Sequence, residues 1–346
     1  MNQKYKTIDY EYLTCPVGDP FADVGGYVIQ YLSGKEPEKD ILQLIEATAK
    51  IYVNKWESKI NTFFLNSPIT HPAFKGEKKI QETINYFKSL LEETADNEEG
   101  FCRISGKKTR LFKAGRDNSL LSGSSTFVNF HHSFQSGMML SKEMLIRMFF
   151  IPYGCEFVGG KLGIIHSGIE EIDAFFVREI CENNDKALAS SSSKGVYKSN
   201  YGIPANALFN FIEDLYTSEL DLVTESPKNI SLTFYHFTNF GASAEMNIYR
   251  LPSTVFKFYS LCLRPQLAEH WNKFLFAHYT SSKHKKAVFN ENTLIYEEKN
   301  KSLLEPIHAE EYRTWNNVLL NKLLNGKSIL RNITNWGKKH EFNFII

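Results

Sequence analysis

A cluster of cations stands out near residue 110 of the sequence. Between positions 103 and 116 six side chains are positive and none is negative; they are Arg103, Lys107, Lys108, Arg110, Lys113 and Arg116. Such a cluster can neutralise backbone phosphates, which releases counterions and makes the affinity depend on salt. Small polar side chains suited to base edges or close backbone approach follow at Asn118, Ser122, Ser124 and Asn129. The stretch predicts a nucleic-acid contact, with a merely solvated hairpin as the alternative.

A second stretch combines charge with aromatic rings. Lys194, Tyr197, Lys198 and Asn200 lie in a segment that also contains Gly195. Tyrosine rings can stack on bases and lysines can follow the backbone, so the segment is typical of a single-strand or minor-groove element. An ordinary surface loop is the alternative. A third run of cations, at 283–286, is too short to indicate a partner.

The sequence contains no P-loop, dinucleotide fingerprint, zincin helix, nucleophile elbow or calcium loop. His131 and His132 are the only adjacent histidines, and neighbours on a strand point to opposite faces, which makes a poor metal pair. Asp19 and Asp23 are spaced for acid–base chemistry, but we expect a helix cap and a first-turn charge instead. We therefore predict no catalytic residue and no cofactor. A soluble α+β enzyme with its site around His131 and His132 is the competing hypothesis.

The first hundred positions are predicted to be mostly helical, and these helices must position Asp19 and Asp23. Asp19 and Pro20 are typical of a helix start, and Gly34 of its end. Apolar residues at a period near 3.6 predict further helices over 41–63 and 80–91. Gly25 and Gly26 fall inside the first helix, where each costs about 1 kcal/mol relative to alanine. Their presence predicts that another part of the chain packs very closely against that face.

The middle of the sequence predicts strands. Two pairs of short β-rich runs flank turns and are typical of hairpins, at 101–104 with 109–112 and at 231–237 with 244–249. The other mid-chain patterns predict a loop at 96–100, a buried helix at 141–152, and a turn followed by a buried strand at 159–167. From about Leu303 the pattern becomes helical again.

The predicted fold class is therefore α+β, with a helical N-terminal segment, a central antiparallel β-rich region with hairpins, and a helical C-terminal segment. We expect one body over 1–300, in which N-terminal helices occupy 20–95 and the β-rich middle occupies 100–300. Residues 301–346 are expected to be the start of a C-terminal helical region that is cut short.

Composition narrows the class of protein. The 346 residues are 42% hydrophobic, which is enough for a sizeable core. Forty Lys and Arg balance 39 Asp and Glu, so the net charge indicates no particular partner. The five cysteines are scattered and odd in number, which favours a reduced compartment over a disulfide scaffold. With no signal peptide and no apolar run of roughly 20 residues, we expect a soluble cytoplasmic protein without a membrane partner.

Four segments, taken in order, are similar to one family. They are Gly18-Asp19-Pro20-Phe21-Ala22-Asp23-Val24-Gly25-Gly26; the run from Tyr153-Gly154 through Gly160 to Ser167; His236–Gly241 with Ile248–Pro252; and Leu319–Arg331. Together they resemble the large subunit of type I, I-A/I-B-like, CRISPR Cascade effector complexes, whose members often carry two C-x-x-C motifs. No single segment is specific, and the resemblance depends on the colinear set.

The chain departs from this family at both cysteine motifs. Cys102-Arg103-Ile104-Ser105-Gly106 stands at the first and Ser141-Lys142-Glu143-Met144 at the second, so one of four thiolates remains. A tetrahedral zinc site needs four nitrogen or sulfur ligands. We predict no bound zinc and a hairpin held by packing of Phe101, Leu111 and Phe112. The family's longer C-terminal bundle is either missing or supplied by a separate small subunit.

The resemblance implies a non-catalytic role. The subunit would contact the flanking-motif duplex and the target double-stranded DNA near the 5′ end of the guide RNA, where it would meet the backbone subunits and the subunit that holds the 5′ handle. It would also help to recruit the helicase-nuclease. Base pairing would read the target sequence while protein reads the short flanking motif. For docking to other subunits we select Asp19, Phe21, Asp23, Gly25 and Gly26.

Overall fold

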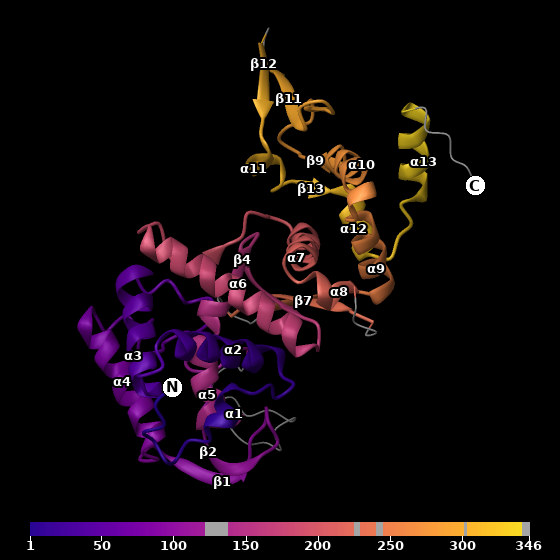
Figure 1. Cartoon of the computed structure of the whole chain (residues 1–346). Coiled ribbons are helices and arrows are strands. Elements are labelled where there is room, and N and C mark those ends of the chain that lie inside the picture. The colour runs from indigo at the N-terminus through magenta and orange to yellow at the C-terminus, as the bar shows by residue number, and fades with distance from the viewer. Residues whose placement is uncertain (122–137, 225–228, 240–244, 301–302, 341–346) are drawn as a thin grey trace. The chain divides into compact units, whose positions relative to one another are not determined.

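The computed structural model describes residues 1–121, 138–224, 229–239, 245–300 and 303–340. The chain forms two compact units (Figure 1). The first comprises Met1–Phe157, Lys161–Lys198 and Tyr235–Asn247, and the second Val158–Gly160, Ser199–Phe234 and Ile248–Ile346. This division differs from the expected boundary at residue 300. Five residues selected above lie outside the described residues: Ser122, Ser124, Asn129, His131 and His132.

Helices dominate the first unit. They are α1 (Tyr10–Thr14), α2 (Pro20–Lys35), α3 (Ile41–Lys50), the π-helical turn η1 (Ile51–Lys55), α4 (Glu77–Leu91), α5 (Lys142–Phe150), the 3₁₀ turn η3 (Ile151–Gly154) and α6 (Glu170–Ala189). Figure 1 shows α2 beside α5 and α6, and both helices contact it. Its middle is buried from Ala22 to Ile29. The predicted helix start at Asp19 is confirmed, and α2 continues one residue past Gly34.

The second predicted helix is shorter than its periodicity suggests. Asp40 caps α3 through a capping box with Gln43, in which each side chain accepts from the other residue's backbone N–H at 2.9 Å. The helix widens into a π turn after Lys50 and ends at Lys55. Glu57 and Ser58 then adopt positive φ values of 51° and 60°, which an α-helix does not tolerate. The apolar period therefore continues beyond the point where the backbone leaves the helix.

A three-stranded antiparallel sheet contains the cationic cluster. Its order is β1-β2-β3, with strands Asn97–Phe101, Lys108–Ala114 and Met138–Ser141. Leu111 and Phe112 are buried, as expected, whereas the Phe101 ring is 66% exposed and does not hold the hairpin. The predicted hairpin is confirmed, but its first strand occupies the segment expected to be a loop. Pairing with β2 overrides the weak strand propensity of Asn-Glu-Glu-Gly.

A five-stranded sheet has the order β6-β4-β5-β7-β8. Its strands are Tyr197–Lys198, Glu156–Val158, Lys161–His166, Leu232–Thr238 and Glu245–Leu251. β7 and β8 are neighbours, which confirms the second predicted hairpin. Gly159 and Gly160 turn the chain at φ 53° and 96° before β5, also as expected. β4 and β6 run parallel, so the middle of the chain is not entirely antiparallel.

The second unit begins with the helices α7 (Pro204–Ser218), α8 (Leu220–Thr224), α9 (Ser253–Cys262) and α10 (Pro265–Phe276). Its strands are β9 (Tyr279–Thr280), β10 (Val288–Asn290), β11 (Ile295–Asn300), β12 (Leu303–Ile307) and β13 (Asn316–Asn317). The remaining helices are α11 (Ala309–Tyr312), α12 (Val318–Leu324) and α13 (Leu330–Lys339). The prediction of helix from Leu303 is wrong for Leu303–Ile307, because these residues form β12 and pair with β11. Helices follow from α11 onward.

The fold class is α+β, with helices toward both ends and several antiparallel sheets between them. Among the helices that the structure describes, none is both long and apolar enough to cross a membrane.

Candidate nucleic-acid interface

The β1–β2 hairpin presents most of the predicted cations to solvent. Its turn closes through backbone bonds from Cys102 N to Lys107 O and from Gly106 N to Cys102 O, at 3.0 and 2.8 Å. Gly106 adopts φ 68°, a conformation that favours glycine. The exposed cations are Arg103, Lys107, Lys108, Arg110 and Lys113, and Arg116 is partly exposed. The hairpin therefore concentrates accessible positive charge at its turn and along β2.

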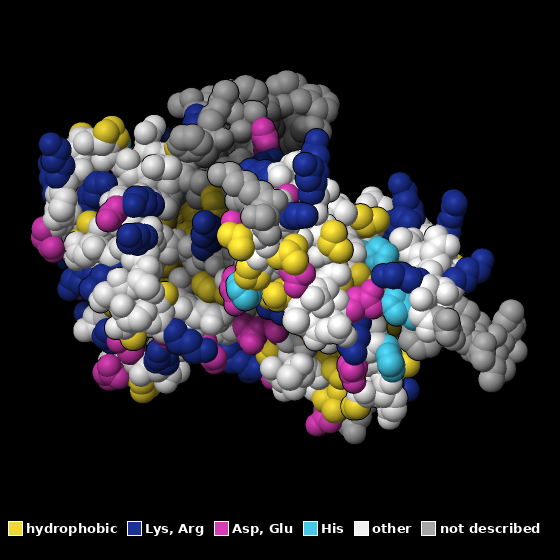
Figure 2. Space-filling model, turned by 90° about the horizontal axis from the view of Figure 1, so that it is seen from above, with side chains coloured by type: hydrophobic (Ala, Val, Ile, Leu, Met, Phe, Trp, Pro, Cys, Tyr) yellow, Lys and Arg dark blue, Asp and Glu magenta, His cyan; other side chains and the backbone are white. Residues whose placement is uncertain are grey.

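The cations of β2 do not form one ridge. Side chains alternate across a strand, so Lys108 and Arg110 share one face while Lys113 projects from the other. Glu99 lies directly opposite Arg110 in the antiparallel register, and Glu98 opposite Leu111. The cluster that is free of acids in sequence therefore has acidic neighbours in space. Figure 2 shows dark blue and magenta side chains interspersed over another face of the molecule.

Two of the exposed cations are paired with carboxylates. Lys107 Nζ contacts Asp9, and it also lies 4.6 Å from the centre of the Tyr12 ring. Arg110 Nη1 lies 2.5 Å from Glu93 Oε2, whose other oxygen accepts from the buried Lys142. Exposed pairs of this kind contribute only about 0.2–1 kcal/mol. A phosphate group can therefore replace either carboxylate at small cost.

The two positions of the degenerate cysteine motifs lie against each other. Ser141 N donates to Cys102 Sγ at 3.4 Å, and Arg103 N donates to Met139 O at 3.3 Å. The Ser141 hydroxyl in turn accepts from Met144 N at 3.4 Å and caps α5. The turn of the hairpin is thus attached to β3 and to the start of α5 by hydrogen bonds, next to the buried side chains of Cys102 and Met144.

The second basic stretch belongs to a different sheet. Tyr197 and Lys198 form β6, which pairs with β4, while Lys194 and Asn200 are exposed on either side of it. Ser193 accepts a hydrogen bond from Trp56 Nε1 at 2.8 Å, which fixes the beginning of the segment. The structure therefore does not join this stretch to the β1–β2 hairpin in one sheet.

The residues selected for docking surround the start of α2. The Asp19 carboxylate accepts from Phe21 N and Ala22 N at 3.1 and 2.8 Å, which confirms its role as the cap. Asp19 and Phe21 are partly exposed, whereas Asp23, Gly25 and Gly26 are buried. The last three are therefore not accessible to a partner's side chains in this conformation and instead support α2 from within.

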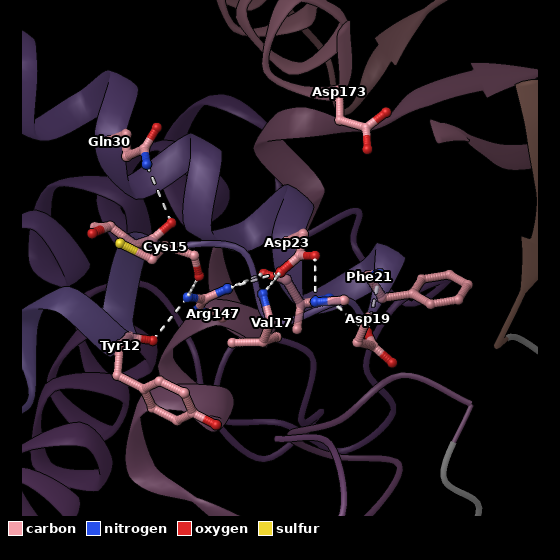
Figure 3. A network of polar contacts seen from close by, with 12 residues as sticks. Tyr12, Cys15, Val17, Asp19, Phe21, Asp23, Gln30, Arg147 and Asp173 are labelled. Atoms are coloured by element: carbon pink, nitrogen blue, oxygen red, sulfur yellow. Dashed lines mark hydrogen bonds and ion pairs between the residues drawn. The ribbon is translucent and has the colours of Figure 1, made fainter. Parts of the chain in front are cut away.

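Arg147 explains why these three residues are buried. Its Nη1 donates to Asp23 Oδ1 at 3.1 Å, and its Nη2 donates to Tyr12 O at 2.8 Å and to the carbonyl of Cys15 (Figure 3). The Asp23 carboxylate also accepts from Val17 N and Gly18 N at 2.7 and 3.0 Å. One guanidinium and one carboxylate thus connect α1, the 15–18 segment, α2 and α5.

The glycine pair permits this approach. A Cβ on Gly25 would lie 2.1 Å from the Arg147 carbonyl oxygen, and one on Gly26 would lie 2.9 Å from Thr14 O. Real Cβ atoms are not found at the first of these distances from backbone. The prediction that something packs very closely against this face is therefore confirmed, and the neighbour is α5.

Burial shifts the pKa values of the pair. Desolvation raises the pKa of the Asp23 carboxyl, and the two backbone amides and the charge of Arg147 oppose that rise. Desolvation also lowers the pKa of the Arg147 guanidinium, against the attraction of Asp23. Asp23 is the main compensation for burying Arg147, whereas the charge of Asp23 is stabilised first by the Val17 and Gly18 amides and then by Arg147. A buried charge that loses its ionic partner is strongly destabilising.

A cavity of about 560 Å³ lies between the start of α2 and the turn of the hairpin. Asp19 and Phe21 line it from one side, and Arg103 and Ile104 from the other. The structure therefore brings two predicted docking residues next to one predicted nucleic-acid-binding residue, although they are more than 80 positions apart in sequence.

Sequence reasoning missed Arg147 and Glu93. Arg147 is the one charge in the otherwise apolar run Met144–Ile151, a pattern that indicates a buried ion partner. Nothing in the sequence marks Glu93, because its two cations come from β2 and α5. No family model, curated protein or solved structure matches the chain.

Proposed function

We propose that the chain is the non-catalytic large subunit of a type I, I-A/I-B-like, CRISPR RNA-guided surveillance complex, acting in the cytoplasm. In this role it contacts the flanking-motif duplex and target DNA near the 5′ end of the guide. Its partners are the guide RNA, the backbone and 5′-handle-binding subunits, a small subunit where one exists, and the recruited helicase-nuclease. The proposal assigns no bond-breaking step to the chain.

The packing of the resembling segments supports the family part of the proposal. Phe21, from the first segment, packs edge-on against Phe237 of β7 with ring centres 5.1 Å apart. η3 and β5, from the second segment, both contact α2. Segments that resemble the family in separate parts of the sequence thus share one core in the first unit.

The hydrogen bond between Ser141 and Cys102 gives further support. The two positions assigned to cysteine pairs converge in space, as the ligands of one metal site must. In this chain the same junction is made by a hydrogen bond and a helix cap.

The observation that carries the proposed contact with nucleic acid is the exposure of five cations on one hairpin, Arg103, Lys107, Lys108, Arg110 and Lys113. The ion pairs of two of them, Lys107 with Asp9 and Arg110 with Glu93, lie at the surface on the side of the cation. Lys194, Tyr197, Lys198 and Asn200 are proposed as a second contact, and Asp19 and Phe21 as the exposed part of a docking surface beside Arg103.

The test is a triple substitution, Lys107→Ala with Lys108→Ala and Arg110→Ala. We expect weaker binding to double-stranded DNA, and a decrease in the slope of log K against log salt of up to about 0.9 for each lost phosphate contact. The matched control replaces Lys283, Lys285 and Lys286, which are exposed in the second unit, by alanine. It removes the same number of positive charges. Equal affinity and slope for the triple variant and the unchanged chain would remove the hairpin from the interface.

A further inference from the structure

An aromatic cavity of about 240 Å³ lies just beyond the end of β2. Its walls include Phe64, Phe74, Tyr86, Phe87 and Phe149, with Ile69 and Pro68 at one side. Phe64, Phe87 and Phe149 are almost fully buried, whereas Phe74 is half-buried and forms the outer wall. The volume is below the ~300–1,000 Å³ of sites for drug-sized ligands, so it suits a single ring system.

The polar end of the cavity comes from the segment that follows the cationic strand. Asp117 and Asn118 line it. Asn118 Nδ2 donates to Tyr86 Oη at 2.8 Å and to Lys113 O at 3.0 Å, which ties the cavity to the end of β2. Within the described residues no hydrogen bond or ion pair engages the Asp117 carboxylate. The cavity therefore presents one partly exposed acceptor beside apolar rings, and this acceptor is available to a ligand.

Tyr86 supplies a donor next to that acceptor. Its oxygen accepts from Asn118, so its own O–H hydrogen remains to be donated. Burial raises the pKa of Tyr86, which keeps the hydroxyl protonated at physiological pH. An acceptor and a donor that line one cavity suit the edge of a nucleobase, which presents both kinds of group.

Cations surround the outer wall. Lys78 Nζ lies 5.2 Å from the centre of the Phe74 ring. A depression that also borders Phe74 is lined by Ser58, Lys75 and Lys79 together with Glu57, whose carboxylate pairs with Lys59. Lys79 Nζ donates to Ser58 Oγ at 3.0 Å. Phe74 thus separates an aromatic cavity from a surface that can hold phosphate.

We infer that this cavity holds one unstacked nucleobase of the bound nucleic acid, with its flanking phosphates against Lys75, Lys78 and Lys79. The inference rests on the proposed function and extends it to a site that is separate from the hairpin turn. An aliphatic side chain of a protein partner would fill the space between the rings but would make no hydrogen bond to the Asp117 carboxylate. A base with an exocyclic amino group uses the rings and the carboxylate together, because it stacks on the aromatic walls and donates to Asp117.

The experiment measures binding of the full chain to two end-labelled single strands of equal length. One strand carries amino-bearing bases, and the other has the same sugar–phosphate backbone without bases. Stacking of one base changes affinity by about tenfold, so the unchanged chain should prefer the first strand by about that factor. Phe74→Ala should reduce the ratio of the two affinities toward one, while the affinity for the abasic strand stays nearly unchanged.

Two further variants make the result decisive. Asp117→Asn keeps the shape of the side chain and is measured with a third strand that carries only thymine. It should reduce the preference for amino-bearing bases over thymine. This variant still tests the inference if Phe74→Ala unfolds the chain. Leu304→Ala removes an exposed apolar side chain of the second unit, outside the cavity and the hairpin, and should change nothing. The Lys107, Lys108 and Arg110 triple variant should weaken both strands equally.

The outcomes separate the two ideas. An unchanged base preference in the folded Phe74 and Asp117 variants would overturn the inference, leave the hairpin contact intact, and favour a protein side chain as the occupant. If the unchanged chain binds neither strand nor duplex DNA at low salt, the proposed function fails and the inference fails with it.

Discussion

Two arginine–carboxylate pairs in the first unit share their chemistry and differ in their surroundings. The side chains of Arg147 and Asp23 are 0% and 6% exposed, whereas those of Arg110 and Glu93 are 48% and 18% exposed. In the first pair, Asp23 also accepts from the backbone amides of Val17 and Gly18, and Arg147 also donates to the backbone carbonyls of Tyr12 and Cys15. The second shares its carboxylate with one further lysine.

The difference shows that an ion pair must be interpreted from its burial. Water compensates either partner of the exposed pair when the other is removed or displaced, which leaves Arg110 available to a ligand. Inside the protein no such compensation exists, so Arg147 is committed to its site. The same residue types thus leave a cation accessible on the hairpin and hold the chain together beneath α2.

The largest expected loss of stability comes from breaking the buried pair. Arg147→Ala should destabilise the first unit by about 3–5 kcal/mol, because it leaves the Asp23 charge buried without its cationic partner. The measurement is urea-induced unfolding followed by circular dichroism. Adding Asp23→Ala should recover part of the loss, since the uncompensated charge is then removed as well. A loss below about 1 kcal/mol for the single variant would show that water reaches Asp23.

A somewhat smaller effect tests the close approach itself. Gly25→Ala should cost about 3 kcal/mol, because its Cβ would overlap the backbone carbonyl of Arg147 and force α2 away from α5. Gly34 lies in the same helix, and a Cβ there would meet nothing within 4 Å, so Gly34→Ala should stabilise by about 0.5–1 kcal/mol. Thermal unfolding of both variants checks the contrast, which fails if both shift in the same direction.

A half-buried pair offers an intermediate case. His166 Nδ1 lies 2.7 Å from Asp173 Oδ2, and this hydrogen bond raises the pKa of His166 above its usual 6.5, helped by the nearby charges of Asp23 and Asp19. The folded state therefore binds the proton more tightly than the unfolded state. The stability that the pair contributes is fully present below pH 6.5 and is lost as the pH rises through the raised pKa.

The measurement is the melting temperature between pH 5 and 9 for the unchanged chain and for Asp173→Asn. The decline across this window should be steeper in the unchanged chain. Parallel curves would mean that His166 titrates alike in the folded and unfolded states.

The smallest effect concerns the exposed pair. Arg110→Ala should change the free energy of unfolding by no more than about 0.5 kcal/mol, because Glu93 keeps Lys142 as a partner. The same unfolding assay as for Arg147 measures it. A loss comparable to that of Arg147→Ala would erase the distinction between the two pairs and argue that Arg110 is structural.

Local features were predictable from sequence and long-range partners were not. The Asp19 cap and the crowding at Gly25 follow from rules that act within one helix. The identity of the crowding residue does not, because Arg147 lies about 120 positions away. Likewise the turn of the cationic hairpin was expected, whereas the carboxylates that moderate its charge come from the residue before α1 and from the segment after α4. The aromatic cavity combines residues from four separate stretches, none of which indicates a pocket alone.

The segment between α1 and α2 has a practical consequence for labelling. Cys15 gives its carbonyl to Arg147 but exposes its thiol, whereas the other four cysteines are buried. Burial also raises the pKa values of Cys155, Cys181 and Cys262, which disfavours their reactive thiolates. A maleimide dye should therefore attach to the folded native chain at one place, without engineered cysteines. The dye would be attached to the segment whose carbonyl accepts from Arg147, so its fluorescence should change when α2 separates from α5.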